Sequence, residues 1–449
     1  MTVVFAILQL MACLAILVAE YNRRSVALFF WGMLCIIFAL PHTMDIVIGG
    51  YSYSDSTMTL ASLFVLLFCF LYAITRRVHL KNPRGFEAGN GALDIFSKEK
   101  SNRVGMREYG AVAIALLLVL SVAAFSRANF GSLGNVTWAG IYSAQDGLSS
   151  PLFALAPYLF ASIGGAIAVL WAKKKWIPFL IMIAACILFL LITRNRIVML
   201  SFVCPLCLLI TSRIKRLSFK SILLGLALVV LILYSVYAIL TFRHAGTMEN
   251  FFSSYSLSTF NRDVFASMLS GEGELGLRNI FYYFIEWDNS FAGFSEGATY
   301  IRILLFWVPT GLSQGIKPDD FAITMASAYM GNPFNETYSV HPTFFGGAFA
   351  NFGFIGFLVG IFWGVVMNCI DAWLSRADYA NKPYLVSALA YAFVIVGRGS
   401  VYNGVMIGIV SVVVIFGASA VLAFFDARKP KTHSGRKSTS MAVGPRKMD

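Results

Sequence analysis

Charged residues are scarce in this chain of 449 residues: only 13% are Asp, Glu, Lys or Arg, and 58% are hydrophobic. A soluble domain would carry about a quarter charged residues. The low charge therefore excludes an ordinary soluble enzyme and predicts an integral membrane protein. Short alternating strands, the pattern of a transmembrane barrel, are also missing, so we expect the membrane spans to be helices.

The absence of several known motifs excludes further classes of function. The chain has no Walker motif and no glycine-rich phosphate loop before a helix, which argues against ATP-driven transport and against chemistry on cytosolic nucleotide sugars. It has no H-E-x-x-H and no Cys/His cluster, so we expect no metal site and no cofactor. The seven cysteines all lie in apolar runs, which argues against a disulfide framework.

Apolar stretches long enough to cross a bilayer, about 20 residues in a helix, recur along the whole chain. The fold class we expect is all-α: a polytopic membrane protein with about 11 transmembrane helices. The ninth span is long enough to hold a tilted or broken helix, because its glycines permit close packing or a break. The expected spans are 2–19, 26–42, 58–75, 110–125, 152–171, 176–193, 197–212, 220–240, 344–372, 383–397 and 404–425.

These spans divide the chain into four parts. We expect an N-terminal transmembrane bundle over 1–240, one large external loop over 241–343, C-terminal transmembrane helices over 344–427, and a basic tail over 428–449. The loop is too long to be a bare linker.

The distribution of Lys and Arg predicts the orientation. One set of alternate loops, together with the tail, holds 26 of the 35 basic residues and is therefore expected to be cytoplasmic. The net charge of +13 is thus mostly a signal of topology. We interpret the tail as a solvated segment near anionic membrane lipid and expect no nucleic acid as a partner.

The nine remaining basic residues are eight Arg and one Lys. Arginine binds carboxylates and phosphates through two parallel hydrogen bonds, so this bias suggests fixed contacts to an oxyanion. Structural pairing with acidic residues of 241–351 and anchoring at the interface are the alternatives. Several of these residues lie in turns at the predicted outer interface, where charge is costly and functional by default. The candidate substrate-binding residues are Arg194, Arg196, Arg243, His244, Arg262, Arg278, Arg302 and Arg398.

His341 is the candidate catalytic residue, with a structural histidine as the alternative. It lies at the end of the external loop, just before the glycine-rich ninth span. Its pKa can be tuned near neutrality, so it could remove a proton from a hydroxyl. The acidic pairs Glu272 with Glu274 and Asp319 with Asp320 are the fallback bases. We otherwise interpret them as ordinary loop residues, with a divalent-ion site as the alternative.

The layout of spans and loops resembles the O-antigen polymerase family, which joins lipid-linked oligosaccharide repeats in the periplasm. The resemblance rests on the number of spans, the large late external loop, the turn Thr193-Arg-Asn-Arg196, the turn Gly397-Arg-Gly399 and the segment His341-Pro-Thr-Phe-Phe-Gly-Gly-Ala-Phe-Ala-Asn-Phe-Gly-Phe-Ile-Gly356. It implies a multi-pass protein of the bacterial inner membrane whose active site faces the periplasm.

The resemblance also implies the substrates. The donor would be a growing glycan on undecaprenyl pyrophosphate, the acceptor a single repeat on the same carrier, and a chain-length regulator protein a further partner. Arginines at the outer interface suit this chemistry, because they would stabilise the lipid pyrophosphate that leaves. A lipid-linked oligosaccharide flippase is the rival from another class, and would be expected to carry charge in mid-span. An O-antigen ligase differs in its acceptor and not in its scaffold.

Overall fold

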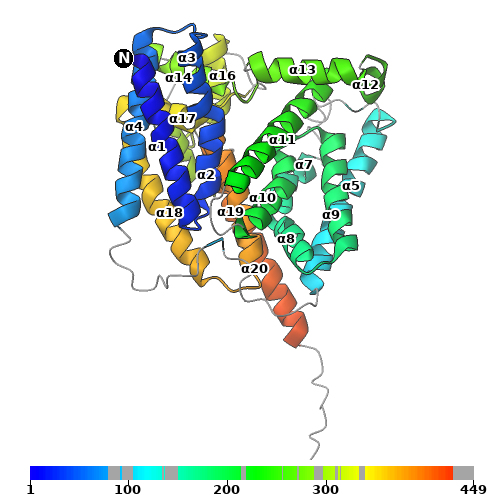
Figure 1. The fold of residues 1–449 in the computed structure, drawn as a ribbon. Helices are drawn as coiled ribbons and strands as arrows, with labels where there is room; N and C mark the ends of the chain where they lie inside the picture. Colours follow the sequence, from blue (N-terminus) through cyan, green and yellow to red (C-terminus); the bar gives the residue numbers. More distant parts are fainter. Residues whose placement is uncertain are drawn as a thin grey trace, which may run out of the picture.

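The computed structural model describes residues 1–78, 92–93, 105–133, 136, 150–213, 219–254, 256–270, 273–287, 297–308, 312–313, 315–332 and 339–427. Within these residues every regular element is a helix, and the long helices stand side by side in a bundle (Figure 1). The predicted basic tail 428–449 and Glu272 lie outside the described residues.

Nine stretches of the described chain are long and apolar enough to cross a membrane, which confirms the predicted fold class. Two further expected spans are occupied by shorter helices, α10 (Arg196–Arg213) and α19 (Lys382–Arg398). The nine contain α1 (Thr2–Asn22), the continuous run Ala27–Ile48, α4 (Asp55–Val78), α5 (Met106–Phe130), α7 (Ser150–Ile163) with α8 (Gly165–Ala172), α9 (Trp176–Thr193), α11 (Phe219–His244), the run Thr343–Arg376 and α20 (Val401–Ala427).

The run Ala27–Ile48 is not a uniform α-helix. It consists of α2 (Ala27–Leu34), a π-helical turn η1 (Cys35–Ala39) and α3 (Leu40–Ile48). The Ala39 carbonyl accepts hydrogen bonds from Gln9 Nε2 at 3.0 Å and from Thr43 Oγ1 at 2.9 Å. These bonds explain why a glutamine is fully buried in an apolar span.

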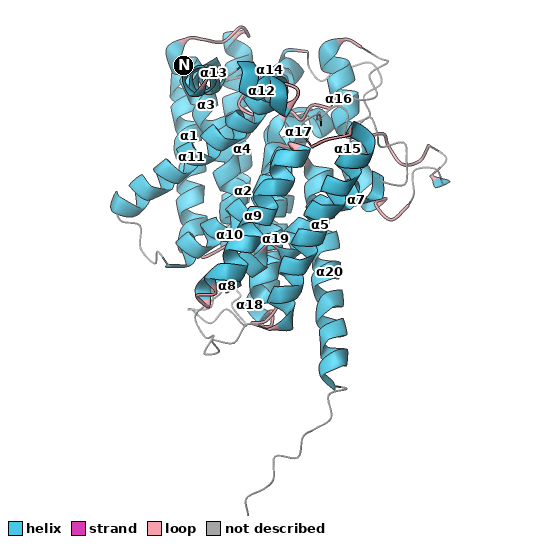
Figure 2. Ribbon diagram, turned by 90° about the vertical axis from the view of Figure 1, so that its right-hand side faces the viewer, coloured by secondary structure: helices cyan, strands magenta, loops and turns pink. Residues whose placement is uncertain are grey.

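The two ends of the bundle differ. At one end, called here the basic end, Arg24 donates to the Thr211 carbonyl, Lys173 pairs with Glu108 at 3.8 Å, and α20 runs out of the bundle (Figure 1). The opposite end, called the capped end, carries the N-terminus and most helices of the predicted external loop (Figure 1). Those helices are α12 (Met248–Ser254), α13 (Leu257–Ser270), α14 (Leu277–Glu286) and α16 (Phe321–Met330), while the short α15 (Ala298–Leu304) lies on the flank (Figure 2).

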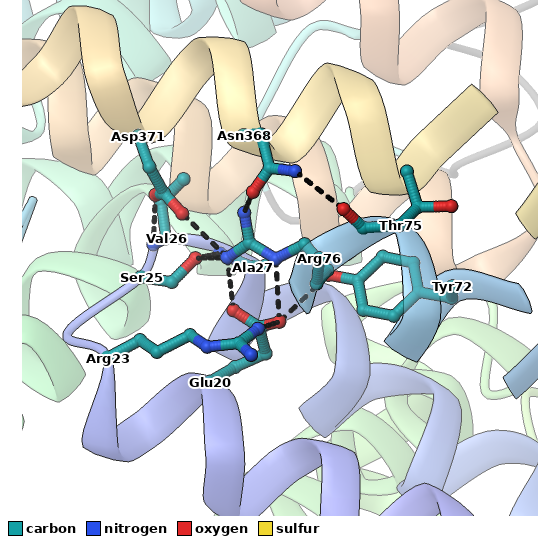
Figure 3. A network of polar contacts seen from close by, with 10 residues as sticks. All are labelled: Glu20, Arg23, Ser25, Val26, Ala27, Tyr72, Thr75, Arg76, Asn368 and Asp371. Carbon is teal, nitrogen blue, oxygen red and sulfur yellow. Dashed lines mark hydrogen bonds and ion pairs between the residues drawn. The ribbon is translucent and has the colours of Figure 1, made fainter. Parts of the chain in front are cut away.

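A buried ionic network fastens three helices at the basic end (Figure 3). Arg76 of α4 binds both oxygens of Glu20 in α1, and its Nη2 lies 2.7 Å from an oxygen of Asp371 in α18. Its Nη1 donates to Asn368 at 2.6 Å. Arg76 and Glu20 are both buried, so the charge of each is compensated inside the bundle, and Arg23 adds a second ion pair to Glu20 at 3.1 Å.

The run Thr343–Arg376 breaks, as its glycines predict, but it also reverses direction. It consists of α17 (Thr343–Phe352), a 3-10 turn η5 (Gly353–Leu358) and α18 (Val359–Arg376). The ring of Phe345 packs 5.3 Å from Phe68 near the middle of α4, and the ring of Phe349 packs 5.7 Å from Phe64, one turn nearer the capped end. Helix α17 therefore runs toward the capped end, against the direction of α4.

Two glycines make the reversal possible. Gly353 has φ of +60°, a region that L side chains rarely adopt, and a Cβ on Gly356 would lie 2.3 Å from the Ala348 carbonyl oxygen. Beyond the turn, Gly360 packs against the Phe68 backbone, so α18 follows α4 toward the basic end. The residues that precede α17 consequently enter the bundle at about the level of Phe68.

Candidate functional site

The turn between α19 and α20 meets the start of α17 at backbone distance. Gly399 has φ of +108°, and a Cβ there would lie 2.6 Å from the Thr343 carbonyl carbon. Only glycine fits such an approach. The contact places Arg398, the last residue of α19, beside His341, which lies two residues before α17.

Glu274 lies between two of the predicted arginines. Arg398 Nε donates to Oε2 of Glu274 at 2.5 Å, and Arg196 Nη1 lies 3.4 Å from the other oxygen, Oε1. The carboxylate comes from the segment before α14, Arg196 opens α10 and Arg398 ends α19, so one acidic side chain joins three distant parts of the chain. All three side chains are at most one-fifth exposed.

The charges of this group do not cancel. Burial raises the pKa of Glu274, but Arg398 and Arg196 outweigh burial and hold that pKa below its usual value. The carboxylate is therefore ionised at neutral pH and supplies one negative charge against two positive ones. The surplus positive charge in a mostly buried place favours the binding of an additional anion.

His341 links this charged group to a pocket. Its Nδ1 is buried and has no hydrogen-bond partner within the described part of the chain. Burial lowers the pKa of His341 to about 3, Arg398 lowers it too, and Glu274 acts in the opposite direction. The imidazole is thus neutral at physiological pH and can accept a proton or a hydrogen bond.

Arg302 also lines that pocket. Its Nη1 donates to the Pro318 carbonyl at 2.6 Å, and its guanidinium lies 4.9 Å from the centre of the Tyr402 ring. Its Nε is buried and finds no hydrogen-bond partner among the residues described. Arg302 and His341 thus line the same pocket, and Arg302 Nη2 also lies 3.8 Å from Asp320 Oδ2. Its lining includes Thr299, Arg302, Asp320, His341, Ser400, Tyr402 and Asn403.

Arg194 contacts neither Glu274 nor the pocket, and its partners lie at the end of α11. It ends α9 in a left-handed conformation with φ of +51° and is only 2% exposed. It stacks 4.5 Å from the Phe242 ring and donates to the Gly246 carbonyl, so it holds the end of α11. Arg243 and His244 occupy the last turn of α11, where Arg243 is half-buried and His244 exposed.

Arg278 and Arg262 each pair with a carboxylate apart from Glu274 and the pocket. Arg278 binds Asp45 through Nε at 2.5 Å and Nη2 at 2.8 Å, which is the two-point geometry expected of arginine. Arg262 is largely exposed and lies 3.5 Å from Asp263. For these two residues, structural pairing with an acidic residue, the alternative to anion binding, explains the choice of arginine. The predicted residues that the structure brings together are Arg196, Arg302, Arg398 and His341.

The sequence identified the histidine and the arginines by type and position, whereas it named Glu274 only as a fallback base. Glu274 lies 124 residues from Arg398 along the chain, and no local sequence pattern predicts that the two side chains meet. Together these residues can bind an anion and accept a proton beside it. Compared with known proteins, the chain matches no family model, no curated protein and no solved structure.

Proposed function

We propose that the protein is a membrane glycosyltransferase that polymerises undecaprenyl-pyrophosphate-linked oligosaccharide repeats at the periplasmic face of the bacterial inner membrane. One observation carries the proposal: a cationic group with a surplus charge adjoins a neutral histidine inside an apolar helical bundle. A lipid-linked pyrophosphate needs both properties, a cationic site for its head and a membrane for its tail.

The arginines would bind the donor pyrophosphate. Arg196 and Arg398 supply the surplus positive charge, and Arg302, which lines the same pocket as His341, supplies a buried N–H that has no partner within the described structure. Donors fixed in a site of low dielectric stabilise charge as it develops on a leaving group. The pyrophosphate of undecaprenyl is the group on which that charge would appear.

His341 would accept the proton of the acceptor hydroxyl. The hydroxyl oxygen forms a bond to the anomeric carbon of the donor, the bond from that carbon to the pyrophosphate oxygen breaks, and undecaprenyl pyrophosphate leaves with the electron pair. Among the protein's own groups the imidazolium is disfavoured, because burial and Arg398 lower the pKa of His341 to about 3. Negative charge on the bound pyrophosphate raises that pKa, so the histidine becomes a better base when the donor is present.

A lipid-linked oligosaccharide flippase is the second candidate. The observation that favours it is the intramembrane network of Glu20, Arg76 and Asp371 (Figure 3), because charge within spans is typical of transporters. This network is tightly paired, lies at the basic end and includes none of the residues around His341. An O-antigen ligase remains the alternative with the same chemistry and another acceptor.

Deletion of the protein separates the three functions. We expect a deletion strain to attach a single repeat to its lipopolysaccharide and to lose every longer band of the ladder. A ligase predicts loss of every repeat with lipid-linked polymer accumulating, and a flippase predicts loss of every repeat with unpolymerised intermediates inside the cell. The purified protein should join lipid-linked repeats into dimers, and its failure to do so would refute the polymerase.

A further inference from the structure

Helix α15 and the residues after it turn apolar side chains outward. Leu304 is 74% exposed and Trp307 is 71% exposed, and Ile301 and Phe306 are also exposed. Scattered exposed apolar residues are ordinary, but a continuous patch marks contact with a membrane or another protein.

The cations of the same segment point inward. Arg302 donates to the Pro318 carbonyl, and Lys317 Nζ donates to the Val308 carbonyl at 2.9 Å. Both side chains are mostly buried. Charged groups inside and apolar groups outside are the reverse of what a water-facing loop requires.

The backbone of this segment also satisfies its own donors. Leu305 N–H donates to the Ile301 carbonyl, Phe306 N–H to that of Ile303 and Val308 N–H to that of Leu305. Hydrocarbon offers no partner for a free N–H, so a segment that enters a membrane must bond its donors internally. Leu305, Phe306 and Val308 meet this condition, three of the four residues that follow the helix.

Contacts with the α17–α18 hairpin place α15 beside membrane helices. Asn351 of α17 accepts hydrogen bonds from the N–H groups of Gly297 and Thr299 at 2.8 and 3.1 Å, which fixes the start of α15. The Tyr300 ring then packs 5.1 Å from Phe352 and 6.5 Å from Phe362 in α18. Helix α15 thus runs along the hairpin from the capped end toward the basic end. It also packs on α20 along the flank of the bundle (Figure 2).

Contacts with α4 show how far along the bundle α15 reaches. Phe362 lies two residues beyond Gly360, which packs against Phe68 near the middle of the α4 span. Tyr300 therefore reaches toward the middle of the bundle, and Leu304 and Trp307 follow it along the chain. Phe362, which the Tyr300 ring contacts, is itself 53% exposed on α18, a helix of an apolar run long enough to cross a membrane.

We propose that residues 298–308 are embedded in the hydrocarbon of the membrane, with lipid acyl chains as their partner. The segment enters beside α18 and α20 without crossing, and its inner face carries Arg302 into the pocket. One wall of the pocket is therefore a membrane-embedded element. The inference depends on packing and exposure alone, so it stands or fails separately from the polymerase activity.

Two exposed tryptophans provide the test. Trp307 follows α15, whereas Trp287 is 59% exposed at the end of α14 in the cap. The full chain in phosphatidylcholine nanodiscs is compared with its Trp307→Phe and Trp287→Phe variants, using brominated acyl chains and, separately, aqueous acrylamide as quenchers of fluorescence. Normal elution of both variants in size-exclusion chromatography shows that they are folded.

We expect Trp307→Phe to remove fluorescence that brominated lipid quenches, and Trp287→Phe to remove fluorescence that acrylamide quenches. Quenching of Trp307 by acrylamide would overturn the proposal, because the segment would then lie in water. Protection of Trp307 from both quenchers would overturn it as well, because a protein surface would then cover this face.

Discussion

At the scale of single residues, Glu274 determines how much positive charge Arg196 and Arg398 present. Its carboxylate pairs with the same guanidinium groups that an anionic ligand would use. Glu274→Gln keeps the shape of the side chain and removes its charge. We expect the variant to bind inorganic pyrophosphate more tightly, by about tenfold for each ~1.4 kcal/mol gained, and to elongate lipid-linked repeats more slowly.

Measuring both affinity and rate shows whether Glu274 limits the charge available to a ligand or only holds the two arginines in place. Isothermal titration calorimetry measures the pyrophosphate affinity, and dimer formation from lipid-linked repeats measures the rate. Asp263→Asn, which removes a comparable partner from the exposed Arg262, is the control and should change neither. Weaker binding by the Glu274 variant would show that the carboxylate only holds the arginines in place.

His341 should make the protein sensitive to acid. Its pKa of about 3 in the folded chain lies below the value of about 6.5 expected in the unfolded chain, so the unfolded chain binds more protons between these two values. Stability that is present above about pH 6.5 is therefore lost progressively as the pH falls toward about 3.

We accordingly expect the melting temperature in detergent to fall less between about pH 7 and about pH 5 in His341→Gln than in the unaltered protein. His244→Gln, at an exposed position, serves as the control. Equal slopes for His341→Gln and the unaltered protein would mean that His341 is solvated and free to charge in the folded state.

At this scale, the sequence supplied the types of residue but not their partners. An excess of arginine in predicted outer turns pointed to Arg196, Arg302 and Arg398, and a histidine before the last long apolar run pointed to His341. The same rule also selected Arg278, whose partner Asp45 lies in another helix and already fills its two-point site. Only tertiary contacts distinguish an arginine that is fully paired from one that leaves charge for a ligand.

At the scale of helices, the ionic network at the basic end holds α1, α4 and α18 together (Figure 3). Removal of one member of a buried ion pair leaves the other charge unpaired and costs about 3–5 kcal/mol. We expect Arg76→Ala to lose about this much stability, because Asp371 would lose its ion pair and Glu20 would keep only the pair with the part-exposed Arg23. Thermal unfolding in detergent measures the loss.

The neighbouring residue offers a matched control. Arg77 is exposed at the same end of α4, so Arg77→Ala should leave the melting temperature almost unchanged. Similar melting temperatures for the two alanine variants would mean that the network contributes little to the packing of these helices.

The helices themselves were largely predictable, but their directions were not. Apolar length located each expected span, and the glycines around Gly353 predicted a break. The reversal at Gly353 depends on which phenylalanines of α17 meet Phe64 and Phe68 of α4, and a hydropathy pattern does not encode that register. The depth at which His341 enters the bundle follows from this reversal, so it could not be predicted either.

At the scale of the whole molecule, the separation of a basic end from a capped end predicts the orientation in the membrane. Loops rich in Lys and Arg remain in the cytoplasm, so the capped end should face the periplasm. Ser258 is exposed in α13 at the capped end, and Lys175 is exposed before α9 at the basic end. Each can be replaced by cysteine in a background in which the exposed Cys369 is serine.

An impermeant thiol reagent applied to intact cells should label Ser258→Cys at once and Lys175→Cys only after permeabilisation. Phe321 and Ala322 of α16, at the capped end (Figure 1), line the pocket beside His341, so this experiment also tests the proposed location of the reaction. If Lys175→Cys reacts in intact cells and Ser258→Cys does not, the orientation is inverted. The arginines would then face the cytoplasm, where lipid-linked repeats are assembled and not polymerised, and the proposed polymerase would have to be abandoned with the topology.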